Sequence, residues 1–360
     1  MIIVNLKRTM RYLRILLGSY VSARLKPHPV WAHLYVTRRC NLHCSYCGVR
    51  DRQKKDLPTH KVKKTVDKMY QLGVRFISFF GGEPTLRKDF PEIVEYAHAK
   101  GMITHVSTNG MLLDDMYIER IAKAGVDIIN VSIDSIAAFD GSEKSYQQGK
   151  ALLERLIAAR SMYSFEIQSN LVLTARNLKS VVPVIKELTS SGIALSLAII
   201  DKIQDMRSQV DSALFFRTES QKQELYRIIR YVILLKRSGV RLLDPLQYYY
   251  DLITHLNGGV EWYCCAGEYS VSVDVDNRIQ LCAGMPSEDI DIMRLDSKSY
   301  RAKVMPLFRQ RMRSCKPTCF SCCLYDTSYC IKHPLYVIKT ILLPPQKSKF
   351  LSFGKSWRIH

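Results

Sequence analysis

The sequence predicts an α/β fold in which a parallel sheet is followed by a small cysteine-rich domain. Two observations lead to this prediction. A strand and helix alternate six times between residues 32 and 201, and eight of the eleven cysteines fall between Cys264 and Cys330. Strands that alternate with helices indicate a parallel sheet with right-handed crossovers. Six repeats fit an open, barrel-like α/β domain, and their number alone does not separate it from a doubly wound sheet.

Short apolar, β-branched runs predict the strands, and stretches with helical periodicity predict the helices between them. The predicted strands are Ala32–Thr37, Arg75–Phe80, Ile103–Ser107, Asp127–Asp134, Phe165–Thr174 and Ile193–Asp201. The predicted helices are Lys61–Leu72, Phe90–His98, Met116–Lys123, Lys150–Arg160 and Leu178–Leu188. A longer amphipathic helix is expected from Thr218 to Ser238, because Thr218 and Gln221 form a capping box and Gly239 is placed to end it.

The composition divides the chain into four segments: a basic amphipathic segment at 1–30, the core domain at 31–245, the cysteine-rich domain at 246–335 and a basic tail at 336–360. Beyond residue 246 the rhythm of strands and helices disappears. For the cysteine-rich domain we therefore expect a core of metal–ligand bonds rather than hydrocarbon.

The chain is strongly basic and rich in cysteine. Its 53 Lys and Arg against 33 Asp and Glu give a net charge of +20, which favours an anionic partner such as nucleic acid, a membrane surface or a phosphorylated substrate. A solvated basic surface explains the charge as well. The first 22 residues lack a signal peptide, because Arg11 and Arg14 interrupt the apolar run. We therefore expect a cytoplasmic protein, in which clustered cysteines are metal ligands rather than disulfides.

The N-terminal segment has an apolar stripe at helical spacing, with six cations and no acid within residues 1–30. The stripe consists of Ile3, Leu6, Met10, Leu13, Leu17 and Tyr20. Such a helix can lie on an anionic membrane surface. It can also pack its stripe on the protein core, and we favour this interpretation because amphipathic helices usually do so.

The segment CNLHCSYC places Cys40, Cys44 and Cys47 directly after the first predicted strand. Three thiolates at this spacing can hold a cubane iron–sulfur cluster from one loop and leave one iron without a protein ligand. A zinc site is the alternative, with His43 or His60 as the fourth ligand, although His43 is badly placed for it.

This loop resembles the signature of the radical S-adenosylmethionine superfamily, in which an aromatic residue, here Tyr46, precedes the third cysteine. The resemblance covers roughly residues 31–201. It includes the motif GGEP, in which Gly81, Gly82 and Glu83 end the second strand. The family's backbone meets the methionine amino group at this motif. The resemblance implies an incomplete (β/α)6 TIM-like barrel, a [4Fe-4S] cluster and S-adenosylmethionine as cofactor.

The next two strands end in polar residues that the resemblance assigns to the cofactor. Asn109 lies in STNG, and Ser132 and Asp134 lie in VSIDS. The carboxyl ends of parallel strands are where α/β folds place their ligands. Asn170 on the fifth strand fits less securely, since a hydrogen-bonded core Asn explains it nearly as well. The resemblance also implies that Tyr46 holds the adenine, that a reductant such as ferredoxin or flavodoxin supplies the electron, and that a deoxyadenosyl radical abstracts hydrogen from the substrate.

The C-terminal cysteines resemble the auxiliary-cluster domains called SPASM and twitch. The resemblance assigns Cys264 or Cys265, Cys282, Cys319 and Cys322 as ligands of at least one auxiliary [4Fe-4S] cluster. The spacing after Cys322 departs from the full SPASM pattern, so the shorter twitch arrangement with one cluster is favoured over two. A structural zinc is the competing interpretation.

The sequence therefore favours a radical enzyme that acts on a peptide or another biosynthetic intermediate. An iron–sulfur electron carrier is the alternative from another class, and it would not need the motifs on strands two to four. A modifier of lipid or phosphorylated intermediates at a membrane is the alternative within the enzyme class. Nucleic acid is not expected as a partner, because no aromatic-rich basic repeat or zinc-finger spacing is present.

Overall fold

A computed structural model describes residues 6–51, 53–200, 210–259, 262–282, 285–315 and 319–336. Nine strands within these ranges form one sheet in the order β6-β5-β4-β3-β2-β1-β7-β8-β9. The strands are β1 (Trp31–Thr37), β2 (Phe76–Gly81), β3 (Ile103–Thr108), β4 (Ile128–Ser132), β5 (Glu166–Leu173), β6 (Ala194–Ile199), β7 (Ser270–Val273), β8 (Arg278–Gln280) and β9 (Ser287–Asp291). Strands β1 to β6 are parallel to their neighbours, as predicted.

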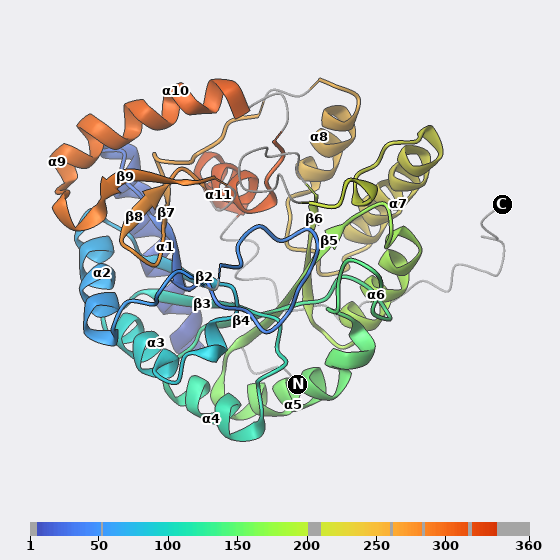
Figure 1. Ribbon diagram of the computed structural model, residues 1–360, viewed down its shortest axis with the longest axis horizontal. Coiled ribbons are helices and arrows are strands. Elements are labelled where there is room, and N and C mark those ends of the chain that lie inside the picture. The colour runs from blue at the N-terminus through green and yellow to red at the C-terminus, as the bar shows by residue number, and fades with distance from the viewer. Residues whose placement is uncertain are drawn as a thin grey trace.

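Helices α2 to α6 lie on the outside of the curved sheet, in an arc around β1 to β6 (Figure 1). The described helices are α1 (Leu6–Leu25), α2 (Thr59–Leu72), α3 (Phe90–Ala99), α4 (Asp115–Lys123), α5 (Tyr146–Tyr163), α6 (Leu178–Ser190), α7 (Glu219–Arg237), α8 (Leu246–Leu256), α9 (Ser297–Ser299), α10 (Met305–Cys315) and α11 (Cys322–Lys332). The predicted incomplete (β/α)6 barrel is confirmed. The capping box of Thr218 and Gln221 at the start of α7 is also confirmed. Asp201, the predicted end of the sixth strand, lies outside the described residues.

The two faces of the sheet differ in chemistry. Apolar side chains such as Leu34, Ile77 and Phe79 belong to the core packed against the helices. The alternate residues, on the inner face, form polar rows that run from strand to strand in register. These rows consist of Gln280, Ser272, His33, Ser78 and His105, then Asn130 and Gln168, then Ser132, Asn170 and Ser196.

The C-terminal region is built differently from the prediction. We expected a core of ligand bonds beyond residue 246, but the region contains helices and a hydrocarbon core. Its buried apolar residues, including Val273, Ile279, Phe308 and Phe320, belong to the same hydrophobic cluster as the barrel. Strand β7 pairs in parallel with β1, so the sheet continues into this region without a break. Apolar burial therefore holds the two parts together, since it is the dominant favourable term in folding.

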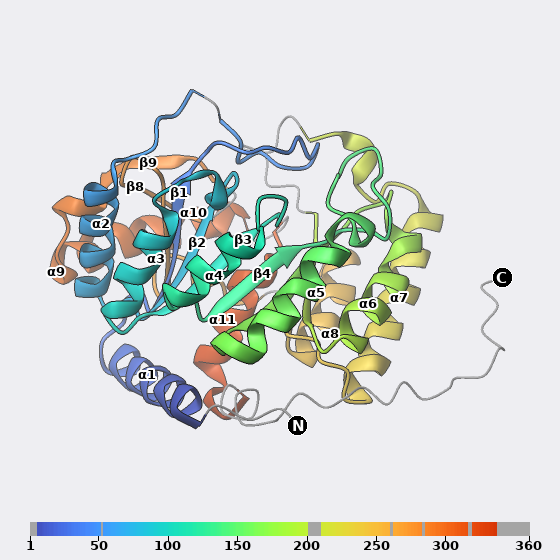
Figure 2. The same cartoon turned by 90° about the horizontal axis from the view of Figure 1, so that it is seen from below.

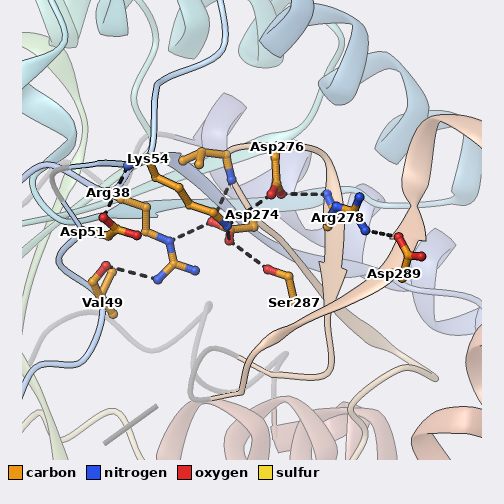
Figure 3. A network of polar contacts seen from close by, with 10 residues as sticks. Arg38, Val49, Asp51, Lys54, Asp274, Asp276, Arg278, Ser287 and Asp289 are labelled. Carbon is orange, nitrogen blue, oxygen red and sulfur yellow. Dashed lines mark hydrogen bonds and ion pairs between the residues drawn. The ribbon is translucent and has the colours of Figure 1, made fainter. Parts of the chain in front are cut away.

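A buried ionic network also joins the two parts (Figure 3). The carboxylate of Asp274, after β7, accepts a hydrogen bond from Nε of Arg38 at 2.8 Å, and their side chains are 1% and 5% exposed. Lys54 forms a second ion pair with Asp274, and Arg38 also donates to the carbonyl of Val49. Burial alone would raise the pKa of Asp274, but the hydrogen bonds from Arg38 and Lys54 outweigh it and hold this pKa well below its usual range. The network joins Arg38 and Lys54 of the loop after β1 to the C-terminal hairpin.

We predict that Asp274→Asn lowers the free energy of unfolding by about 3 kcal/mol, because it leaves the buried Arg38 guanidinium without its carboxylate. Urea unfolding at pH 7 measures the change. The matched control is Asp289→Asn, which breaks the exposed ion pair with Arg278 in the same network and should leave the stability nearly unchanged. Equal effects of the two substitutions would contradict the role given to burial.

Candidate functional site

The cysteine loop, residues 38–58, connects β1 to α2 and carries Cys40, Cys44 and Cys47. Cys44 is buried, Cys40 is half-buried and Cys47 is exposed. The loop folds back on itself, because the amide of Leu42 lies 3.4 Å from Sγ of Cys40 and the amide of Cys47 donates to the carbonyl of Cys44 at 3.1 Å. The loop follows the carboxyl end of β1, where a parallel sheet of this kind binds ligands.

Gly81 and Gly82 lie where the ends of β1 and β2 approach most closely. A Cβ atom at Gly81 would be 2.3 Å from the carbonyl oxygen of Thr37, and one at Gly82 would be 2.1 Å from that of Arg39. The amide of Gly82 donates to Thr37, and that of Glu83 donates to Arg39 at 2.7 Å. The two glycines are therefore required by backbone contact with the cysteine loop, whatever else binds there.

Glu83 holds two strand ends together with its carboxylate, which is fully buried. The carboxylate accepts hydrogen bonds from the amide and hydroxyl of Thr85, from the hydroxyl of Thr108 and from the amide of Asn109. These four donors occupy both carboxylate oxygens. The carboxylate therefore joins the GGEP segment to the end of β3.

Asn109, after β3, is placed against the cysteine loop. Its Nδ2 donates to Oδ1 of Asn41 at 2.8 Å and lies 4.0 Å from Sγ of Cys40. Its Oδ1 accepts from the amide of Met111, which fixes the orientation of the side chain. Hydrogen bonds to ligand sulfurs tune iron–sulfur clusters, so this amide is positioned to act on a cluster bound by Cys40.

The side chains of Tyr46 and Asp134 are hydrogen-bonded to each other. Ser142 and Lys144, which lie outside the sequence motifs, belong to the same network. The Tyr46 hydroxyl donates to Oδ2 of Asp134 at 2.5 Å, and the ammonium of Lys144 lies 2.8 Å from the same hydroxyl. Ser142 donates to Asp134 at 2.7 Å, and its hydroxyl lies 3.8 Å from Sγ of Cys44. Burial and the neighbouring carboxylate raise the pKa of Tyr46 well above its usual value, so the hydroxyl stays protonated. Asp134 is itself fully buried and holds Tyr46 in place.

The remaining predicted side chains lie on the inner face of the sheet. Ser132 is half-buried at the end of β4, directly opposite Asn170 of β5 in the ladder. Oδ1 of Asn170 is buried and has no hydrogen-bond partner within the described residues. The sequence left open that Asn170 is a hydrogen-bonded core residue. This interpretation fails at Oδ1, which accepts no hydrogen bond from the described residues.

The donor set of the cysteine loop fits an iron–sulfur cluster, because its three ligand groups are thiols from one loop. Within the described ranges, no three His, Cys, Asp or Glu side chains converge on a point that would hold one metal ion. A cubane does not need such convergence, since each of its thiolate ligands binds a different iron atom.

Five C-terminal cysteines were predicted as ligands, and the structure distinguishes one of them. Cys265 is fully buried, its thiol donates to the carbonyl of Leu324 at 3.7 Å, and its backbone amide donates to the hydroxyl of Ser328 at 3.1 Å. Cys264 and Cys282 are half-buried, while Cys319 and Cys322 are buried. Cys265 is thus packed into the core in this arrangement.

Comparison with known proteins agrees with the motif positions. Residues 34–159 match the family model described as the Radical SAM superfamily. The chain is 40% identical over 114 residues to the Fe-coproporphyrin III synthase of Methanosarcina barkeri, a match that covers 31% of this chain and 28% of the relative. It is 36% identical over 128 residues to the PqqA peptide cyclase of Granulibacter bethesdensis, covering 35% and 34%. The matched region spans about a third of the length of these relatives.

The fold is similar to that of Streptococcus suis SuiB, solved with its precursor peptide SuiA. The TM-score is 0.60 at 14% sequence identity, with 85% of this chain and 73% of that chain covered. The similarity in structure therefore extends well beyond the residues that the family model matches. At this level of identity it concerns the fold alone.

We predict that Gly82→Ala displaces the cysteine loop, because the new methyl group would meet the Arg39 carbonyl oxygen. The free energy of unfolding should fall by about 2 kcal/mol. The iron bound after anaerobic reconstitution should also fall. Gly18→Ala is the control, since nothing lies within 4 Å of a Cβ at this position in α1. It should be neutral or stabilise the protein by up to about 1 kcal/mol. Full iron binding and unchanged stability of Gly82→Ala would contradict the prediction.

Proposed function

Because the chain belongs to the radical S-adenosylmethionine superfamily through residues 34–159, we propose that it binds a [4Fe-4S] cluster and S-adenosylmethionine and starts radical chemistry on a peptide or another biosynthetic intermediate. The observation that carries the proposal is the position of Cys40, Cys44 and Cys47. They lie in one loop at the carboxyl end of the sheet, fastened by backbone bonds to GGEP.

The chemistry that the two cofactors supply when bound is reductive cleavage of S-adenosylmethionine to methionine and a deoxyadenosyl radical, which abstracts hydrogen from the substrate. The side chains of this protein bind these cofactors and fix their orientation. The three thiolates bind the cluster, and Asn109 directs its amide toward Cys40. The half-buried backbone at Gly81 and Gly82 is assigned to the methionine amino group. Ser132 faces the cofactor from β4.

Tyr46 is proposed to hold the adenine, and its neighbours keep it in place. The bond from its hydroxyl to Asp134 fixes the ring, and Asp134 also accepts from the amide of Val172. Lys144 places a cation 5.1 Å from the centre of the Tyr46 ring. Asp134 therefore acts through Tyr46 rather than on the cofactor directly.

The polar rows on the inner face of the barrel favour a substrate that is polar and uncharged. Burial lowers the pKa of His33 to about 4, and burial together with His33 lowers the pKa of His105 to about 3, so both imidazoles are neutral at pH 7. Oδ1 of Asn170 and both polar atoms of the Gln280 amide have no partner within the described residues. A peptide group offers the donor and the acceptor that these amides lack. SuiB, the structural neighbour, is named with a precursor peptide, which points the same way.

We include one auxiliary [4Fe-4S] cluster in the proposal, with Cys264, Cys282, Cys319 and Cys322 as its ligands. The sequence leaves Cys264 or Cys265 as the first ligand. We choose Cys264, because the Cys265 thiol donates to the carbonyl of Leu324 in α11. The functional division is then the core at 31–245 and the auxiliary region at 246–335.

The proposed electron donor is a cytoplasmic reductant such as ferredoxin or flavodoxin. The proposed location is the cytoplasm, where the protein binds peripherally to an anionic membrane surface. Among the described helices, none has both the length and the apolar character to cross a bilayer. An iron–sulfur electron carrier is the alternative function, and it would have no use for Ser132 at the end of β4.

We predict that the reduced, reconstituted protein cleaves S-adenosylmethionine to deoxyadenosine and methionine, slowly, even without its substrate. Cys44→Ala should abolish cleavage, because a cubane held by two thiolates loses its anchorage and its cofactor geometry. Cys282→Ala should retain part of the activity. Chromatography after anaerobic dithionite reduction measures the deoxyadenosine.

Binding of S-adenosylmethionine by protein with a full core cluster, but without deoxyadenosine above the Cys44→Ala background, would favour the electron carrier. This outcome should be sought with candidate peptides present as well as absent.

We also predict that the reconstituted protein holds about eight irons per chain, as two four-iron clusters require. Cys264→Ala should reduce the value to about four, whereas Cys265→Ala should keep about eight and mainly lower the stability. The reverse pattern would exchange the roles of the two residues. About twelve irons would indicate a second auxiliary cluster. About four irons together with retained zinc would indicate that the C-terminal cysteines hold a structural zinc ion.

A further inference from the structure

Helix α1 lies across the end of the sheet opposite the cysteine loop (Figure 2). It is attached by polar contacts rather than by its apolar stripe. Arg11 forms an ion pair with Asp127 at 2.6 Å, Tyr12 donates to the same carboxylate at 3.1 Å, and Arg8 forms an ion pair with Glu166. Asp127 and Glu166 stand at the beginnings of β4 and β5, so α1 is held at the amino ends of the strands.

Four large apolar side chains of α1 are exposed. Met10, Leu17, Val21 and Leu25 are 58%, 45%, 55% and 82% exposed. Their spacing of seven, four and four residues places them on one side of the helix. The expectation that the predicted stripe packs on the core is therefore wrong for Met10 and Leu17. Ile3, another member of that stripe, lies outside the described residues.

We propose that this face of α1, defined by Met10, Leu17, Val21 and Leu25, docks on an anionic lipid bilayer. The proposal deepens the peripheral membrane association proposed above and does not depend on the radical reaction. Four exposed apolar side chains on one helix face are a recurrent feature of helices that lie in the membrane interface.

Charge identifies the bilayer as the occupant. Arg14 is exposed within this face of α1, four residues after Met10 and three before Leu17. Arg24 and Lys26 are exposed near its C-terminal end, and residues 1–30 contain no acid. Each Lys or Arg near an anionic membrane surface contributes to binding. A second copy of the chain docked by the same face would bring these cations against their counterparts, which like-charge repulsion disfavours.

The position of α1 also sets the orientation of the bound protein. Helix α1 lies at the amino ends of the strands, whereas the cysteine loop lies at their carboxyl ends (Figure 2). The site therefore opens away from the bilayer to which α1 binds. This orientation favours a substrate delivered from solution over a lipid drawn directly from the same membrane.

The test is co-sedimentation of the full chain with vesicles of phosphatidylcholine alone or mixed with phosphatidylglycerol. The intact protein should partition onto the mixed vesicles, and added salt should weaken binding. Changing Met10, Leu17, Val21 and Leu25 together to Gln should weaken partitioning by at least about 10-fold. Changing Arg14, Arg24 and Lys26 together to Gln should weaken it by about 100-fold.

The matched control is Met116→Gln with Leu234→Gln, which removes exposed apolar side chains from α4 and α7 and should leave partitioning unchanged. Undiminished binding by the α1 apolar variant, or no binding by the intact chain, would overturn the proposal. A concentration-dependent dimer that the apolar variant abolishes would assign the face to a second copy instead. Cleavage of S-adenosylmethionine by the apolar variant should equal that of the intact chain, so this result is independent of the radical mechanism.

Discussion

The close backbone contact between the ends of β1 and β2 is the constraint on which the candidate site depends. No side chain fits at Gly81 or Gly82, because the carbonyl oxygens of Thr37 and Arg39 occupy the space. The contact permits two backbone hydrogen bonds, which fix the first residues of the cysteine loop before any cluster is bound. The buried carboxylate of Glu83 then extends this order to the end of β3 and to Asn109. Three successive strand ends are thus held in one arrangement, and such preorganisation is what a site for a reactive intermediate requires.

The C-terminal region completes this arrangement from the other side of β1. Strand β7 pairs with β1 along Trp31 to Leu34, and Asp274 follows directly after β7. Its ion pair with Arg38 therefore connects the cysteine loop to the hairpin that leads to Cys282. A charge pair this deeply buried costs desolvation energy and adds little net stability. Its consequence is positional, because it fixes the loop of one proposed cluster relative to a strand that leads to the other.

The sequence allowed the repeating part of the fold to be predicted, because each β/α unit carries its own periodicity and α7 carries its own capping box. It also located the cysteine loop and the strand ends, since the motifs are contiguous. It could not show that the Glu83 carboxylate is fully used within the protein or that Lys144 reaches Tyr46 from another loop, because such partners lie far apart in the chain. The hydrocarbon core beyond residue 246 was missed for a related reason. Its apolar residues pack against the barrel, and no regular spacing within the segment records that contact.

The positions of the charged residues indicate whether the net charge favours an anionic substrate or an anionic surface, which composition alone does not. A net charge of +20 suggested an anionic partner without saying whether substrate or surface. On the inner face of the barrel, His33 and His105 are held neutral by burial, and the other polar residues of the rows are Ser, Asn and Gln. On α1, by contrast, exposed cations lie within and near a row of exposed apolar side chains. An anion would find its complement on the outside of the molecule and would lose solvation on the inside. The basic character of the chain therefore supports the proposed membrane surface more than a phosphorylated substrate.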